Sequence, residues 1–169
     1  MKQGILLFCF DTEHTKYHKI LERCVGLITK AGKPWNNVDR HMAYELSPYD
    51  KTLVMDIDYF CYSDNLLQLF DTNYNFLVPD KAFDLSDRNS FDHRRFSMIP
   101  MVWATVLYFK KNKEVEQIFK MVKYVKDWYP YFTDLYRIQA RNFRNDYAFA
   151  IALQQLKGFI GYDKFPFAL

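Results

Sequence analysis

Two short apolar runs in this chain are continuous rather than alternating, and both are followed by acidic residues. The first spans residues 5–10 and precedes Asp11, and the second spans residues 53–55 and precedes Asp56. A strand with one face in water alternates apolar and polar side chains, so an unbroken apolar run indicates a strand that is covered on both faces. Helices are therefore expected on both sides of the sheet.

The remainder of the chain alternates between strand-like segments and segments with helical periodicity. Further strands are predicted over 74–78 and 98–109, and helices after Asp11, over 39–48, after Ser63, over 113–128 and over 145–156. Strands that alternate with helices predict a three-layer α/β/α domain with a mainly parallel central sheet. A length of 169 residues predicts one domain, 1–169.

Composition narrows the class of protein. The net charge of +3 is the balance of 23 basic and 20 acidic residues, which is too mild to indicate nucleic-acid binding by itself. The three cysteines lack CxxC spacing, so a cytoplasmic location is expected. No run approaches the roughly 18 apolar residues of a membrane span, and the chain is expected to be soluble.

The acidic residues that end the second strand are Asp56 and Asp58. On an extended chain, side chains two residues apart project to the same side. Like charges repel, so a cation or water must reach this pair. Hard divalent ions such as Mn²⁺ or Mg²⁺ prefer oxygen ligands and keep positions for a substrate diphosphate. So short a motif is also found by chance, and a strand that simply ends in solvent remains the alternative.

A longer pattern surrounds this pair. Residues 40–71, RHMAYELSPYDKTLVMDIDYFCYSDNLLQLFD, resemble the central block of nucleotide-sugar glycosyltransferases of the GT-A fold, the group that contains glycogenin and the bacterial lipopolysaccharide galactosyltransferases. The matching order is a helix that begins at Arg40, a P-Y-D-K turn, an apolar strand, the D-x-D pair and a second helix. The resemblance implies a GT-A-like domain that uses Mn²⁺ or Mg²⁺ to transfer a sugar from a nucleoside-diphosphate sugar, with a UDP-sugar favoured. The acceptor stays open between a glycan, a protein and modified DNA.

The resemblance also implies roles for individual residues. Asp56 would reach the ribose or the metal, Asp58 would bind the metal, and Arg40 would contact the sugar or the diphosphate. The segment RNDYAFAIAL resembles the start of a family helix whose acid lies near the transferred sugar, which assigns Asn145 and Asp146 to orienting that sugar. The expected contacts to the nucleotide are Phe10, Asp11, Thr12 and Tyr17.

Some residues depart from the family pattern. The strand VWATVLYF at 102–109 resembles the family's F-N-A-G-V-L-L-F, but Trp103 and Thr105 replace its Asn and Gly. The family's late His motif has no counterpart in this chain. These departures favour an alternative, a catalytically impaired binding or structural module. A third hypothesis is a compact viral transferase that glycosylates modified DNA bases, which the mild basicity and three arginines, Arg88, Arg94 and Arg95, would suit.

Two further patterns are open to two interpretations each. The lysines Lys120, Lys123 and Lys126 recur at helical spacing and are interpreted as the solvent face of a helix rather than a nucleic-acid surface. The aromatic residues 128–132 are interpreted as core, with stacking on a sugar or base as the alternative.

Overall fold

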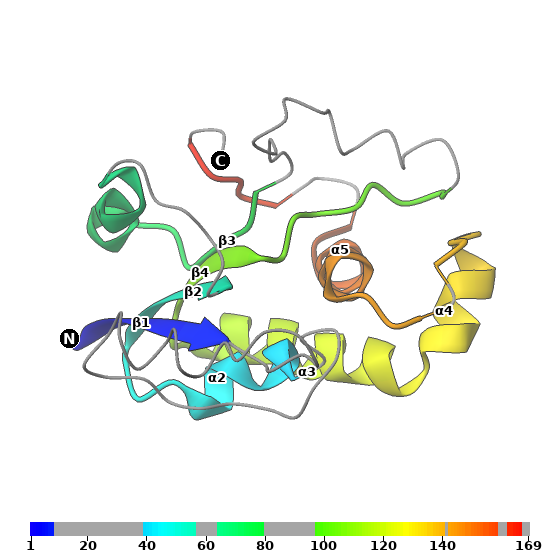
Figure 1. Cartoon of the computed structure of the whole chain (residues 1–169), viewed down its shortest axis with the longest axis horizontal. Coiled ribbons are helices and arrows are strands. Elements are labelled where there is room, and N and C mark those ends of the chain that lie inside the picture. Colours follow the sequence, from blue (N-terminus) through cyan, green and yellow to red (C-terminus); the bar gives the residue numbers. More distant parts are fainter. Residues whose placement is uncertain (9–38, 57–63, 80–96, 141, 159–161, 167–169) are drawn as a thin grey trace, which may run out of the picture.

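The computed structural model describes residues 1–8, 39–56, 64–79, 97–140, 142–158 and 162–166 (Figure 1). These residues form an α/β fold around a four-stranded sheet with the order β1-β2-β4-β3. The strands are β1 (Gln3–Phe8), β2 (Lys51–Asp56), β3 (Phe76–Leu77) and β4 (Val106–Lys110). The predicted α/β class is confirmed.

The sheet is mixed. Strand β2 pairs in parallel with β1, whereas β4 is antiparallel to both β2 and β3. A mainly parallel sheet is therefore not confirmed for the described strands, of which one pairing in three is parallel. An unbroken apolar run indicates that both faces of a strand are covered, but it does not determine the direction of the neighbouring strand.

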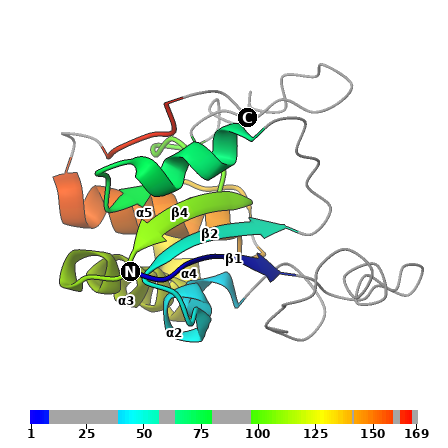
Figure 2. The same cartoon turned by 90° about the vertical axis from the view of Figure 1, so that its left-hand side faces the viewer.

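Burial on both faces is confirmed for β2. Val54 faces a core that includes helices on one side of the sheet, and Leu53 and Met55 face a second core on the other side. Figure 2 shows α2 (Ala43–Leu46) and α3 (Lys113–Asp127) on one side and the 3₁₀ helix η2 (Asn65–Asp71) on the other. Burying each such apolar side chain contributes about 1.5–3 kcal/mol.

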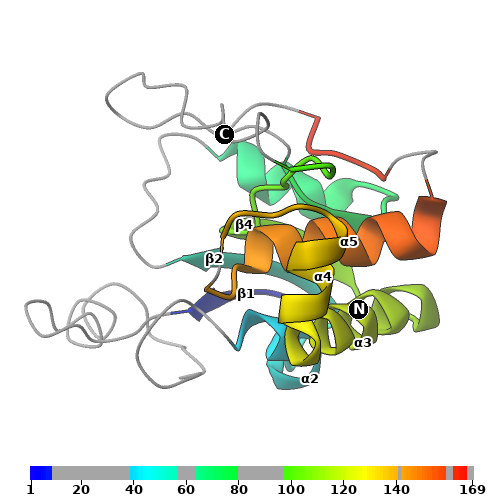
Figure 3. The ribbon, with the colours of Figure 1, turned by 90° about the vertical axis from the view of Figure 1, so that its right-hand side faces the viewer.

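Helix α3 covers the first core and follows its sequence signals closely. Asn112 caps it, because its side-chain oxygen accepts the backbone N–H of Val115 at 2.9 Å. Its buried positions, Val115, Ile118, Phe119, Val122 and Val125, recur at helical spacing. Helix α5 (Asn145–Lys157) packs beside α3 (Figure 3) and is buried over its first nine residues. Both predicted helices are thus confirmed to within a residue at the described ends.

Helix α4 (Tyr129–Leu135) was not predicted, and it includes Pro130 in its first turn. Proline cannot continue a helix, in agreement with the end of α3 just before it. Proline also suits the first turn of a new helix, where the backbone N–H groups make no hydrogen bond within the helix. The interpretation of the aromatic cluster as core is confirmed for part of it. Tyr129 and Phe132 are buried in the core, whereas Trp128 and Tyr131 are exposed by 58% and 59%.

The basic face of α3 lies in solvent, as predicted for Lys120 and Lys123. Each of them pairs with an acid one turn away along α3, Glu116 and Asp127 respectively. Exposed pairs of this kind contribute roughly 0.3–0.5 kcal/mol each. None of the described helices is long and apolar enough to cross a membrane.

The strand predicted over 98–109 is much shorter than expected. Only Val106–Lys110 is a strand, and the residues before it run as an irregular, largely buried segment that includes Ile99, Val102 and Ala104. Apolar content predicted their burial correctly, but a buried segment need not be regular. The irregular path turns the backbone of Ala104 toward the end of β2, where the predicted site lies.

Candidate functional site

Asp56 is the last residue of β2, and the parallel register places it opposite Phe8, the last residue of β1. Its backbone N–H donates to the carbonyl of Thr105 at 3.1 Å, and its side chain is 14% exposed. The chain that continues from both strand ends lies outside the described residues. It contains the predicted nucleotide contacts Phe10, Asp11, Thr12 and Tyr17, and the predicted metal ligand Asp58.

Arg40 pairs with Asp56 at the end of β2. It begins the 3₁₀ helix η1 (Arg40–Met42), and it is only 2% exposed. One terminal nitrogen, Nη2, donates to Oδ1 of Asp56, and the other, Nη1, donates to the carbonyl of Ala104. A buried charge is tolerated only when it is paired, so Arg40 and Asp56 depend on one another.

The peptide of Ala104 links this ion pair to the start of α5. Its carbonyl accepts from Arg40, and its N–H donates to Oδ1 of Asp146 at 3.0 Å. The side chains of Arg40 and Asp146 therefore meet at the backbone of one residue, and Asp56 joins them through Arg40. We call Arg40, Asp56, Ala104 and Asp146 the Arg40 network.

Asp146 lies in the first turn of α5 and is largely buried, as is its neighbour Asn145. Its second oxygen, Oδ2, accepts from Nη2 of Arg144 at 3.1 Å. A carboxylate at this position is also favoured by the partial positive charge of the helix N-terminus. Both carboxylate oxygens of Asp146 therefore accept a hydrogen bond. Arg144, whose side chain is 43% exposed, places a positive charge at the surface next to the Arg40 network.

Tyr129 lies close to this helix start. Burial raises its pKa to about 12, and the Asp146 carboxylate acts in the same direction while Arg144 opposes it. Its ring packs edge-on against Phe143, with centroids 5.1 Å apart. The phenol is thus neutral at physiological pH, and it contributes a polar but uncharged wall beside Asp146.

Thr105 carries a buried polar atom next to Asp56. Its Oγ1 is shielded from solvent, and it has no hydrogen-bond partner within the described parts of the chain. A buried hydroxyl without a partner costs about 1–3 kcal/mol. Thr105 is one of the two residues that depart from the family pattern.

The structure brings Arg40, Asp56 and Asp146 together as one connected unit, with Asn145 beside them. The resemblance pointed to these four residues but not to Arg144 or the Ala104 peptide. Arg144 had a signal, an arginine two residues before an acid at a predicted helix start. The Ala104 peptide had none, because any residue type supplies the same backbone groups.

Of the two predicted metal ligands, one lies among the described residues. Among the described residues, no three His, Cys, Asp or Glu side chains gather as a metal site would require. Asp56 is present, with one oxygen engaged by Arg40, and Asp58 lies outside the described residues. The metal at Asp56 and Asp58 stays a prediction, and so does DNA modification, because Arg88, Arg94 and Arg95 lie outside as well.

Comparison with family models, curated proteins and solved structures found no match to this chain. The glycosyltransferase hypothesis therefore rests on the residue pattern and on the geometry described above.

Proposed function

We propose that this protein is a GT-A-like glycosyltransferase that moves a sugar from a nucleoside-diphosphate sugar to an acceptor with the help of a divalent ion. The observation that carries the proposal is the Arg40 network. The arginine, the first D-x-D aspartate and the helix-start aspartate are residues that the resemblance assigns to the site. Arg40 binds both Asp56 and the backbone of Ala104, which in turn binds Asp146. They lie at the carboxyl end of β2, the end of α/β strands at which ligands bind.

Within this proposal, Arg40 is a positioning residue rather than a substrate contact. Its burial and its hydrogen bonds to Asp56 and Ala104 hold it inside the protein, where it keeps Asp56 correctly oriented. Asp58 would then hold the divalent ion together with Asp56. When bound, Mn²⁺ or Mg²⁺ would stabilise the charge that develops on the departing diphosphate.

Asp146 is suited to hold the transferred sugar. A carboxylate offers about four lone-pair positions, and two of them are filled by Ala104 and Arg144. The remaining positions can accept sugar hydroxyls, with Asn145 as a neighbouring polar group. Arg144 reaches solvent from the same helix start, where its guanidinium could pair with diphosphate oxygens.

Calorimetry of UDP binding with and without Mn²⁺ tests the metal. We expect Mn²⁺ to strengthen binding in the natural protein, and Asp58→Ala to abolish that gain. Asp64→Ala is a matched control, since Asp64 precedes η2 and lies outside the proposed site. Unchanged Mn²⁺-dependent binding in Asp58→Ala would rule out the proposed metal ligand.

The second candidate is a binding or structural module that keeps the fold without turnover. It is favoured by Trp103 and Thr105, which stand where the family pattern has Asn and Gly. A panel of UDP- and GDP-sugars with Mn²⁺ separates the two candidates, since an active transferase also passes sugar slowly to water. Release of free sugar that Asp146→Asn reduces supports the enzyme. Nucleotide binding without any sugar release supports the module.

A further inference from the structure

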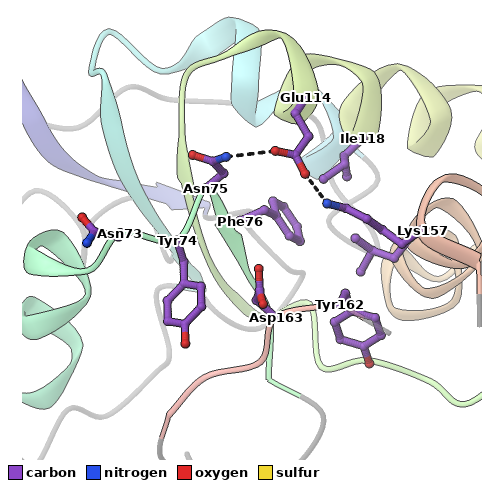
Figure 4. Close-up of a pocket in the computed structure, with 10 residues that line it drawn as sticks. Asn73, Tyr74, Asn75, Phe76, Glu114, Ile118, Lys157, Tyr162 and Asp163 are labelled. Atoms are coloured by element: carbon purple, nitrogen blue, oxygen red, sulfur yellow. Dashed lines mark hydrogen bonds and ion pairs between the residues drawn. The ribbon is translucent and has the colours of Figure 1, made fainter. Parts of the chain in front are cut away.

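A polar hollow opens at the end of the sheet opposite Asp56. It has a volume of about 130 Å³ and lies beside Asn75, just before β3 (Figure 4). The Asn75 carbonyl accepts the N–H of Lys110, which pairs across the sheet with Lys51 at the start of β2. At about 3.3 Å per residue along β2, the hollow is roughly 16 Å or more from the Asp56 end.

The floor of the hollow is apolar and its rim is aromatic. Phe76 and Ile118, both buried in the core, lie beneath it. The rings of Tyr74 and Tyr162 stand on two sides of it, with Asp163 between them (Figure 4). Tyr74 is 45% exposed, so its ring is accessible to a ligand.

Charged groups surround this apolar floor. Glu114, at the start of α3, accepts hydrogen bonds from Nδ2 of Asn75 at 2.9 Å and from Nζ of Lys157 on α5. These two bonds, that of Lys157 first, lower the pKa of Glu114, which keeps it an acceptor at neutral pH. About two of its four lone-pair positions remain for other donors. Asp163 adds a second carboxylate.

This combination selects a neutral ligand rich in hydroxyl groups. Two carboxylates oppose an anion, and Lys157, which offsets the charge of Glu114, weakens the attraction for a cation. A purely apolar ligand would strip water from Glu114 and Asp163 without replacing their hydrogen bonds. A cavity of about 150 Å³ holds benzene, so the hollow has room for approximately one six-membered ring.

We propose that this hollow binds one sugar ring of a carbohydrate, separately from the donor site. The apolar face of the ring would lie against Tyr74 and the floor, and its hydroxyls would donate to Glu114 and Asp163. The inference rests on the hollow alone, and it holds whether or not the protein transfers sugars.

Saturation-transfer NMR with the methyl glycosides of glucose, galactose and mannose tests it. Transfer to the ring protons of at least one glycoside is expected. Tyr74→Ala and Asp163→Asn should each weaken its binding roughly tenfold, as expected for the loss of a hydrogen bond to a charged group or of a stacked ring. Glu114 is left intact, because it also joins α3 to α5.

Two variants serve as controls. Tyr131→Ala removes an equally exposed tyrosine from α4, and Asp56→Asn alters the donor site. Both should bind the glycoside as the natural protein does, so failure of this site is distinguishable from failure of the proposed function. No transfer to any of the three glycosides would overturn the proposal. So would binding in Tyr74→Ala and Asp163→Asn that equals the binding of the natural protein, or transfer to tetramethylammonium alone, which would assign the hollow to cations.

Discussion

The two ends of the β-sheet both carry ion pairs, but water reaches them very differently. At the carboxyl end of β2, Arg40 and Asp56 are 2% and 14% exposed, and a backbone peptide adds further hydrogen bonds. At the other end, Lys157 and Glu114 are 36% and 43% exposed. A buried pair is held in one geometry because separating the two charges would leave each of them buried without compensation. In an exposed pair, each charge can instead be solvated by water. The first suits a preorganised site, and the second suits a rim that a ligand can enter.

The largest effect should come from breaking the buried pair. Arg40→Ala removes the cationic partner of the largely buried Asp56 and also removes a donor from the Ala104 carbonyl. We expect a loss of about 3–5 kcal/mol in the free energy of unfolding, measured by urea denaturation. The exposed pair provides the control, since Lys157→Ala should cost at most about 1 kcal/mol. Equal losses in the two variants would remove the distinction between the two ends.

The alkaline limit of stability should depend on Tyr129. Burial raises its pKa to about 12 from 10.0, so between pH 10 and 12 the folded protein retains a proton that the unfolded chain has lost. Stability from this group is complete below pH 10 and falls as the pH rises to 12, by up to about 1.4 kcal/mol per pH unit. Tyr129→Phe should flatten the profile of unfolding free energy over this range. Tyr131→Phe, at an exposed position, should leave the slope unchanged.

Asp146 should contribute through the Ala104 peptide. Asp146→Ala leaves the Ala104 N–H buried without its acceptor, which should cost about 1–3 kcal/mol of unfolding free energy. Asp146→Asn keeps an oxygen in place and should cost less. If both substitutions cost the same, the carboxylate charge rather than the hydrogen bond to Ala104 would hold the helix start.

The smallest effect is expected at Glu114. Its pKa is lowered by the hydrogen bonds of Lys157 and Asn75, so its contribution to stability is present above the ordinary value of 4.5. That contribution is lost as the pH falls below 4.5 and through the lower pKa of the folded protein. Glu114→Gln should therefore reduce the acid dependence of urea unfolding slightly. A steeper acid dependence in this variant would contradict the assignment.

The structural features of this protein differ in how well the sequence predicts them. The buried strand β2 and the helices α3 and α5 follow from local patterns of apolar side chains, which one segment carries by itself. The antiparallel direction of β4 and the irregular path before it depend on tertiary packing. The pairing of Arg40 with Asp56 was not predicted, because the resemblance assigned both residues to one site but gave Arg40 a contact to the sugar or the diphosphate.

The link through Ala104 could not be predicted at all. Its side chain is a single methyl group, and both of its functional atoms belong to the backbone. Helix α4 was not predicted for a different reason, because a proline can follow the end of one helix and also lie in the first turn of the next. The burial of side chains was therefore easier to predict than the path of the backbone. The candidate site depends on the backbone path at Ala104.

The central claim is that Asp56, held by Arg40, and Asp58 bind the ion that carries the nucleotide diphosphate. A crystal structure with Mn²⁺ and UDP tests it most directly, because the anomalous signal of manganese locates the ion without reference to the rest of the site. We predict a manganese peak bound by Asp58 and Asp56 and bridged to the UDP diphosphate, with Arg40 still paired to Asp56. A peak elsewhere in the molecule, or UDP bound away from the end of β2, would contradict the account.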